Sequence, residues 1–127
     1  MIRGYLIGES IKPGTRLENL RLTLVRVERK PQGNAAPHQP KIWTFIEFDA
    51  DEDPDRLARA LSEVLDDTPL GGKPHSWYSN FIWQDEKFVI FPHRVIRYRL
   101  GDKEGLKEAR DYARSVGVPP PQADWQE

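Results

Sequence analysis

The sequence predicts an α+β two-layer sandwich, in which an antiparallel sheet of five to six strands carries two helices on one face. Three observations lead to this prediction. Short segments rich in β-branched and aromatic residues occur in two groups of three, one amphipathic helical pattern follows each group, and turn residues separate neighbouring segments. The order is βββα-βββα, with a ferredoxin-like variant as the alternative. A chain of 127 residues is expected to form one domain, residues 1–127.

The first group of strands precedes residue 49. Residues 3–11 predict a strand interrupted by two glycines, and residues 12–15 predict a turn. Leucines alternate along residues 20–27, which indicates a second strand. Residues 31–40 hold three prolines and no apolar periodicity, so we expect a flexible Pro-rich loop. Residues 41–48 are β-branched or aromatic at nearly every position, which predicts a central strand covered on both faces.

A helix is predicted to begin after Asp53. Aspartate is a favourable N-cap, Pro54 suits the first helical position, and Asp55 complements the helix dipole. The apolar residues that follow share one helical face, which we expect to lie against the sheet: Leu57, Leu61, Val64 and Leu65.

The second group of strands is rich in aromatic residues. The pattern predicts strands at residues 77–83, 87–91 and 94–100. Pro92-His93 predicts a tight turn between the last two, because proline fixes φ and histidine tolerates a left-handed conformation. Without that turn, the last two strands would form one long strand.

A second helix is predicted from Asp102, its N-cap, to Gly117, a glycine stop that valine and proline follow. Its apolar stripe is small and permits close packing: Leu106, Ala109, Ala113 and Val116. Residues 119–127 are predicted to be an extended tail. We expect Trp125 in this tail to pack back on the domain, because a tryptophan is costly to leave exposed.

Composition excludes several classes of protein. With no cysteine there is no disulfide framework, thiolate metal site or thiol nucleophile. No secretory leader is recognisable and no apolar run is long enough to span a bilayer, so a cytoplasmic, bacterial-type protein without membrane contact is expected. The net charge of −1 argues against a dedicated nucleic-acid binder. Residues 47–67 are strongly acidic and residues 87–110 basic, an asymmetry that could steer a partner or pair two copies.

No catalytic, metal-binding or nucleotide motif is complete. The acidic run 49–53 begins like a calcium loop but lacks the glycine at the sixth position and the glutamate at the twelfth. Residues 71–73 do not form a phosphate loop, and no nucleophile-elbow glycines flank His75-Ser76. We therefore predict no catalytic residue, cofactor or metal. The three histidines are expected to be surface residues in loops: His38, His75 and His93.

Aromatic and basic side chains of the second half form the candidate binding surface. The aromatic residues exceed what two modest helices are expected to cover, so part of the sheet face should remain for a partner, a second copy or a ligand. The surface comprises His75, Trp77, Tyr78, Asn80, Trp83, Arg94, Arg97 and Arg99.

The second half also carries a resemblance. The Trp77-Tyr78-x-Asn80-Phe81 segment, the Phe88–Phe91 and Arg94–Tyr98 strands and the segment ending at Trp125 resemble a family of small uncharacterised bacterial proteins, a domain of unknown function. The likeness covers most of the chain. It implies a widespread small domain and brings no catalytic residue, because the family has no assigned activity.

Three functions from different classes follow as hypotheses. The leading one is a non-enzymatic interaction module that docks a protein partner or a second copy through the aromatic sheet face. The first alternative is a small-molecule-binding protein or enzyme with a pocket near His75, Tyr78, Asn80 and Arg97. The second is a single-stranded nucleic-acid binder that uses the arginines and strand aromatics, since residues 87–91 loosely echo an RNA-recognition motif.

Overall fold

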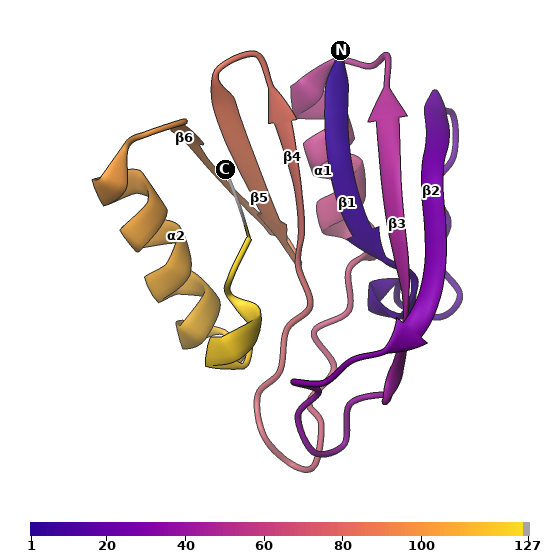
Figure 1. The fold of residues 1–127 in the computed structure, drawn as a ribbon, viewed down its shortest axis with the longest axis vertical. Helices are drawn as coiled ribbons and strands as arrows, with labels where there is room; N and C mark the ends of the chain where they lie inside the picture. The colour runs from indigo at the N-terminus through magenta and orange to yellow at the C-terminus, as the bar shows by residue number, and fades with distance from the viewer. Residues whose placement is uncertain (126–127) are drawn as a thin grey trace.

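A computed structural model describes residues 1–125 of the chain. In these residues six strands form one antiparallel sheet in the order β2-β3-β1-β4-β5-β6, and two α-helices pack on it (Figure 1). The elements are β1 (Ile2–Ile7), β2 (Leu22–Pro31), β3 (Ile42–Ala50), α1 (Pro54–Val64), β4 (Ser79–Trp83), β5 (Glu86–Phe91), β6 (Arg94–Arg99) and α2 (Lys103–Ser115). Single turns of 3-10 helix occur at Gly8–Ser10 and Pro120–Gln122.

The predicted α+β sandwich with βββα-βββα order is confirmed. The ferredoxin-like alternative would alternate as βαββαβ and does not describe this chain. β1 joins the two halves, because it pairs with β3 along one edge and with β4 along the other. The sequence could not reveal this, since the two neighbours of β1 come from distant segments.

The two helices pack on opposite faces of the sheet, so their predicted placement on one face is wrong. Successive side chains of β5 point to opposite faces. Phe88 and Ile90 pack in the core that contains α1, whereas Val89 and Phe91 pack in the core that contains α2. We call these the α1 face and the α2 face. Helical periodicity shows which side of a helix is apolar but not which face of the sheet it meets.

The larger core lies on the α1 face. Phe81 and Phe88, paired across β4 and β5, stack with ring centroids 4.5 Å apart. The Phe48 ring of β3 lies over Gly4 of β1, where any side chain on residue 4 would collide with the ring. The predicted stripe of α1 is confirmed, because its four apolar residues are buried.

The smaller core lies on the α2 face. The small residues Ala109 and Ala113 bring α2 close to β5 and β6, as predicted. Trp125 is 5% exposed and donates its indole N–H to the hydroxyl of Tyr98 at 3.0 Å. The expectation that this tryptophan packs back on the domain is therefore confirmed; the last two residues of the predicted tail lie outside the described residues.

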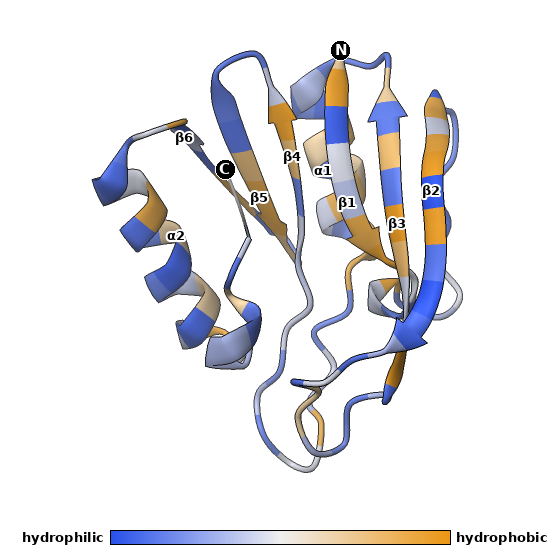
Figure 2. Ribbon diagram, viewed as in Figure 1, coloured by the Kyte–Doolittle hydropathy of each residue, from blue (hydrophilic) through white to orange (hydrophobic). Residues whose placement is uncertain are grey.

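Part of the α2 face is not covered by a helix. α2 and the C-terminal segment lie over β5 and β6, whereas β1, β3 and β2 continue beyond them (Figure 1). Polar and apolar residues alternate along β2 and β3 in Figure 2, as expected for strands with one solvated face. β3 lies inside the sheet, as predicted, and within residues 41–48 only Lys41 and Ile42 are exposed. Trp43 and Phe48, on opposite faces, are buried, whereas residues 44–47 are partly covered.

Pro92-His93 forms the predicted hairpin turn between β5 and β6, and His93 has the expected positive φ of 59°. Residues 31–40, predicted to be a flexible loop, differ from that prediction at both ends. β2 continues to Pro31, and Gln39 is buried. Within residues 1–125, no helix combines the length and apolar character needed to cross a membrane.

Candidate binding groove

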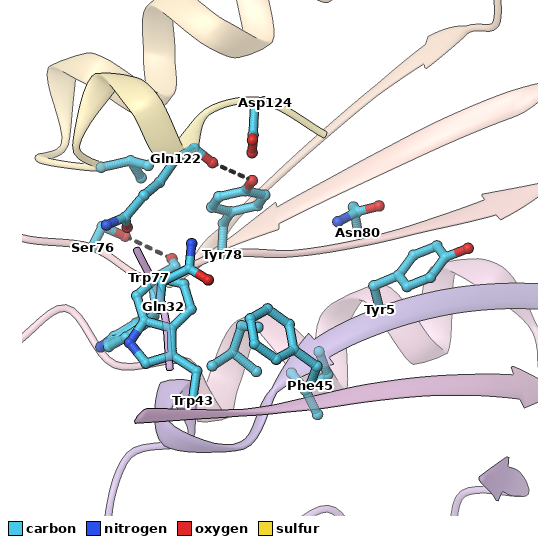
Figure 3. Close-up of a pocket in the computed structure, with 13 residues that line it drawn as sticks. Tyr5, Gln32, Trp43, Phe45, Ser76, Trp77, Tyr78, Asn80, Gln122 and Asp124 are labelled. Carbon is cyan, nitrogen blue, oxygen red and sulfur yellow. Dashed lines mark hydrogen bonds between the residues drawn. The ribbon is translucent and has the colours of Figure 1, made fainter. Parts of the chain in front are cut away.

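A groove lies on the α2 face between the C-terminal segment and the uncovered strands β1 and β3 (Figure 3). It has a volume of about 210 Å³. The residues that line it are Tyr5, Leu6, Ile7, Gln32, Trp43, Phe45, Ser76, Trp77, Tyr78, Asn80, Val118, Gln122 and Asp124. A smaller hollow of about 100 Å³ adjoins it over β1, β2 and β3 and shares Tyr5, Leu6, Ile7 and Phe45 with it.

Aromatic rings form the walls of the groove and hold one another in place. Trp43 meets Trp77 edge-on with ring centroids 5.1 Å apart, and Phe45 is tilted against Trp43 at 6.1 Å. On the opposite wall, Tyr78 packs edge-on against the buried Trp125 at 5.3 Å. These rings are fixed before any ligand arrives, which lowers the entropic cost of binding.

Two polar side chains at one end of the groove have unused hydrogen-bonding capacity. Tyr5 and Asn80 are cross-strand neighbours on β1 and β4, and Figure 3 shows them side by side. Neither side chain forms a hydrogen bond within the described part of the chain. Asn80 is half-buried, so its amide is costly to leave without a partner and is a natural contact for a ligand.

A buried amide cluster fixes the C-terminal wall. Gln39 and Gln122 form two hydrogen bonds: Gln122 Nε2 donates to Gln39 Oε1 at 2.6 Å, and Gln39 Nε2 donates to Gln122 Oε1 at 3.1 Å. The backbone carbonyl of Gln122 also accepts from the Tyr78 hydroxyl at 2.5 Å. Burial raises the pKa of Tyr78, so this residue stays a neutral donor.

His75 belongs to the same cluster, and the expectation of a surface histidine is wrong at this position. Its Nε2 lies 2.8 Å from Gln39 Nε2, which can only donate, so Nε2 accepts and the proton resides on Nδ1. Nδ1 has no partner among the described residues. Burial lowers the pKa of His75, partly offset by Asp66, and favours this neutral form.

The structure brings three of the predicted site residues to the groove: Trp77, Tyr78 and Asn80. His75 lies behind Trp77, with ring centroids 5.2 Å apart, and borders a separate hollow of about 340 Å³ beside α2. Trp83 lies two residues after Phe81 on β4 and therefore shares the α1 face, opposite the groove.

The three arginines of β6 do not converge on the groove. Arg97 lies on the α1 face, over the Phe88 ring at 4.5 Å and paired with Asp55 at 3.0 Å. Arg94 lies over Tyr112 beside α2. Arg99 pairs with Asp85 at 3.5 Å. The pocket predicted from His75, Tyr78, Asn80 and Arg97 is therefore not assembled as one site, because alternate strand residues face opposite sides.

The serine and the histidine nearest the groove have separate partners. The Ser76 hydroxyl donates to the carbonyl of Trp77, and His75 contacts Gln39, so serine and histidine do not form a nucleophile–base pair. Within residues 1–125 no three histidine or acidic residues converge to hold a metal ion.

Several groove residues were missed by the sequence analysis. Tyr5, Gln32 and Phe45 come from the first half of the chain, and Gln122 and Asp124 from the tail. Alternation along a strand could have placed Tyr5 and Phe45 on a solvated face. Nothing in the sequence indicates that this face meets the tail.

No protein-family model, curated protein or solved structure matches the chain. The resemblance to a family of small bacterial proteins therefore stays a prediction.

Proposed function

We propose that this protein is a non-enzymatic binding protein that holds a small organic molecule in the groove of the α2 face. One observation carries the proposal. Five aromatic rings surround a hollow of about 210 Å³, and one end of that hollow presents the unpaired polar groups of Tyr5 and Asn80. Ligand sites typically combine such apolar walls with a few polar groups that fix orientation.

The volume limits the size of the ligand. Protein sites for drug-sized ligands usually measure about 300–1,000 Å³, so a groove of about 210 Å³ suits a fragment-sized molecule or a single projecting group. An apolar body would lie against Trp43, Phe45 and Tyr78. A hydrogen-bonding group would meet Asn80, whose amide can both donate and accept.

A ligand-observed NMR screen of small organic fragments tests the proposal, with tryptophan fluorescence as a second readout because Trp43 and Trp77 line the groove. We expect Asn80→Leu to weaken the binding of fragment hits roughly tenfold or more, since a buried polar contact is lost. Glu63→Gln, an exposed change on α1, is the matched control. Hits that bind both variants equally would place the site elsewhere, and an absence of hits would remove the proposal.

A second candidate function, self-association, is favoured by the edge strand β2. Its residues Leu24, Val25 and Val27 are 62%, 48% and 54% exposed, an unusual apolar load for a sheet edge. The hydrogen bond from Gln32 N to Lys41 O fixes which backbone groups face β3. Because these groups alternate along a strand, the backbone N–H and C=O groups of Val27 and Arg29 point away from β3, toward the open edge of the sheet.

The charges of β2 favour a second copy as the occupant of this edge. If two β2 strands pair antiparallel about Val27, Arg26 of each copy lies opposite Glu28 of the other. Shifting the pairing by two residues, the smallest change that keeps the same faces aligned, would set Arg26 opposite Arg26 in one direction and Glu28 opposite Glu28 in the other. One register is therefore preferred. The bulge between Leu24 and Arg26 confines the pairing to a short segment, and a weak dimer is expected.

Light scattering over a concentration series tests this candidate. We expect Arg26→Glu to weaken the dimer about tenfold, because two attractive contacts become repulsive, and Glu28→Arg added to it to restore association. A wild-type protein that stays monomeric at high concentration, or a double variant that fails to recover while remaining folded, would reject the β2 interface.

A further inference from the structure

We propose that the ligand of the groove is an organic cation, an ammonium group that carries alkyl substituents. This inference rests on the proposed function and specifies its ligand class. Among the described residues that line the groove, Asp124 is the only charged one, and it lies exposed at the rim. The other polar groups of the lining are neutral.

The aromatic walls suit a cation for an electrostatic reason. The face of an aromatic ring carries negative quadrupole density, and several rings around one hollow attract an alkylammonium group while contacting its methyl groups. Tyr5, Phe45 and Tyr78 offer rings to the same space as the two tryptophans (Figure 3). A carboxylate at the rim adds a long-range attraction that a neutral ligand would not feel.

The protein already places an ammonium group over one of these rings. The Nζ atom of Lys30 lies 4.9 Å from the ring centroid of Phe45, at the smaller hollow that adjoins the groove. Lys30 is paired with Glu28 at 3.1 Å, and Arg26 and Glu47 line the same hollow. That hollow therefore adds no net charge. Asp124 is the charged residue of the groove's own lining, and Arg110, outside that lining, acts on Tyr78 with the opposite sign.

The neutral side chains of the groove are compatible with this ligand. A quaternary ammonium group, as in choline, has no N–H to donate, so the rings rather than the amides must hold it. Asn80 and Tyr5 would then bind a polar group attached to the cation, such as the hydroxyl of choline or the amide of a modified lysine.

The experiment compares choline with 3,3-dimethyl-1-butanol, its neutral isostere of nearly equal shape, by calorimetry and tryptophan fluorescence on the intact protein. We expect choline to bind at least tenfold more tightly. Asp124→Asn should reduce that preference several-fold, whereas Asp51→Asn, another exposed aspartate outside the groove, should not. N-acetyl-trimethyllysine amide is measured in the same way. Tighter binding than choline would indicate a cation carried by a protein side chain, and weaker binding would indicate a free organic cation.

The outcomes separate this inference from the proposed function. Equal binding of choline and its isostere would overturn the cation and leave a groove that binds apolar molecules. The same conclusion follows if neither compound binds but fragments sensitive to Asn80→Leu do. If no compound of any class binds, both the inference and the proposed function fall.

Discussion

Replacement of Gln39 by alanine tests whether the amide cluster behind the groove holds the C-terminal wall. The side chain of Gln39 takes part in four contacts: Ala36 N at 2.8 Å, the two amide atoms of Gln122 at 2.6 and 3.1 Å, and His75 Nε2 at 2.8 Å. It is 4% exposed, so Ala36 N, Gln122 Oε1 and His75 Nε2 would lose these hydrogen bonds in a largely dry site, whereas Gln122 Nε2 would keep its bond to the Asn34 carbonyl.

The expected loss of stability follows from these contacts. A net hydrogen bond contributes about 1 kcal/mol, and a buried partner left unsatisfied costs about 1–3 kcal/mol, so Gln39→Ala should cost roughly 2–4 kcal/mol. For a chain of this size that corresponds to a fall in Tm of roughly 10 °C. A double-mutant cycle with Gln122→Ala should yield a coupling energy of about 1–3 kcal/mol, because the two amides bond each other twice.

Urea and thermal denaturation followed by circular dichroism measure both quantities. Gln32→Ala is the matched control, since the only hydrogen-bond partner of its amide within residues 1–125 is the neighbouring Asn34, and it should cost less than about 1 kcal/mol. A cost below about 1 kcal/mol for Gln39→Ala, or a coupling near zero, would show that the Gln39–Gln122 pair does not hold residues 31–40 to the tail. Among the described residues, only the two hydrogen bonds of Asn34 to Pro121 and Gln122 would then join the loop to the tail.

Three further predictions concern the cores and the pH dependence of stability. Gly4→Ala should cost about 1–3 kcal/mol in chemical denaturation, because the new Cβ would lie 2.4 Å from Phe48, whereas Gly33→Ala meets no atom within 4 Å and should be near neutral. Burial lowers the pKa of His75 below its unfolded value near 6.5, so its contribution to stability is present above that value and is lost as pH falls toward the folded pKa. The loss is at most about 1.4 kcal/mol per pH unit, and His75→Gln should remove it; an unchanged slope would contradict this assignment. Trp125→Phe keeps a buried ring but loses the indole hydrogen bond and should lower stability by about 1–3 kcal/mol; a Tm equal to that of the wild type would refute this contribution.

The sequence predicted those features that depend on residues close together in the chain. Asp53 and Asp102 cap the two helices as expected, with side-chain oxygens that accept the N–H groups of the first turn. The turn at Pro92-His93 also follows from local φ preferences. The six strands, the order of the elements and the buried stripe of α1 were predicted for the same reason, since periodicity is a local property.

Only the tertiary structure decided which segments meet. The sequence shows that α2 has an apolar stripe of small residues, but the choice between the two faces of the sheet depends on the whole topology. The groove depends on that choice. Because α2 lies opposite α1, the tail crosses the α2 face and brings Gln122 and Asp124 to the same groove as Tyr5 and Phe45 from the first half of the chain. Short-range preferences determine the elements, whereas burial of their apolar faces against one another determines where a binding site forms.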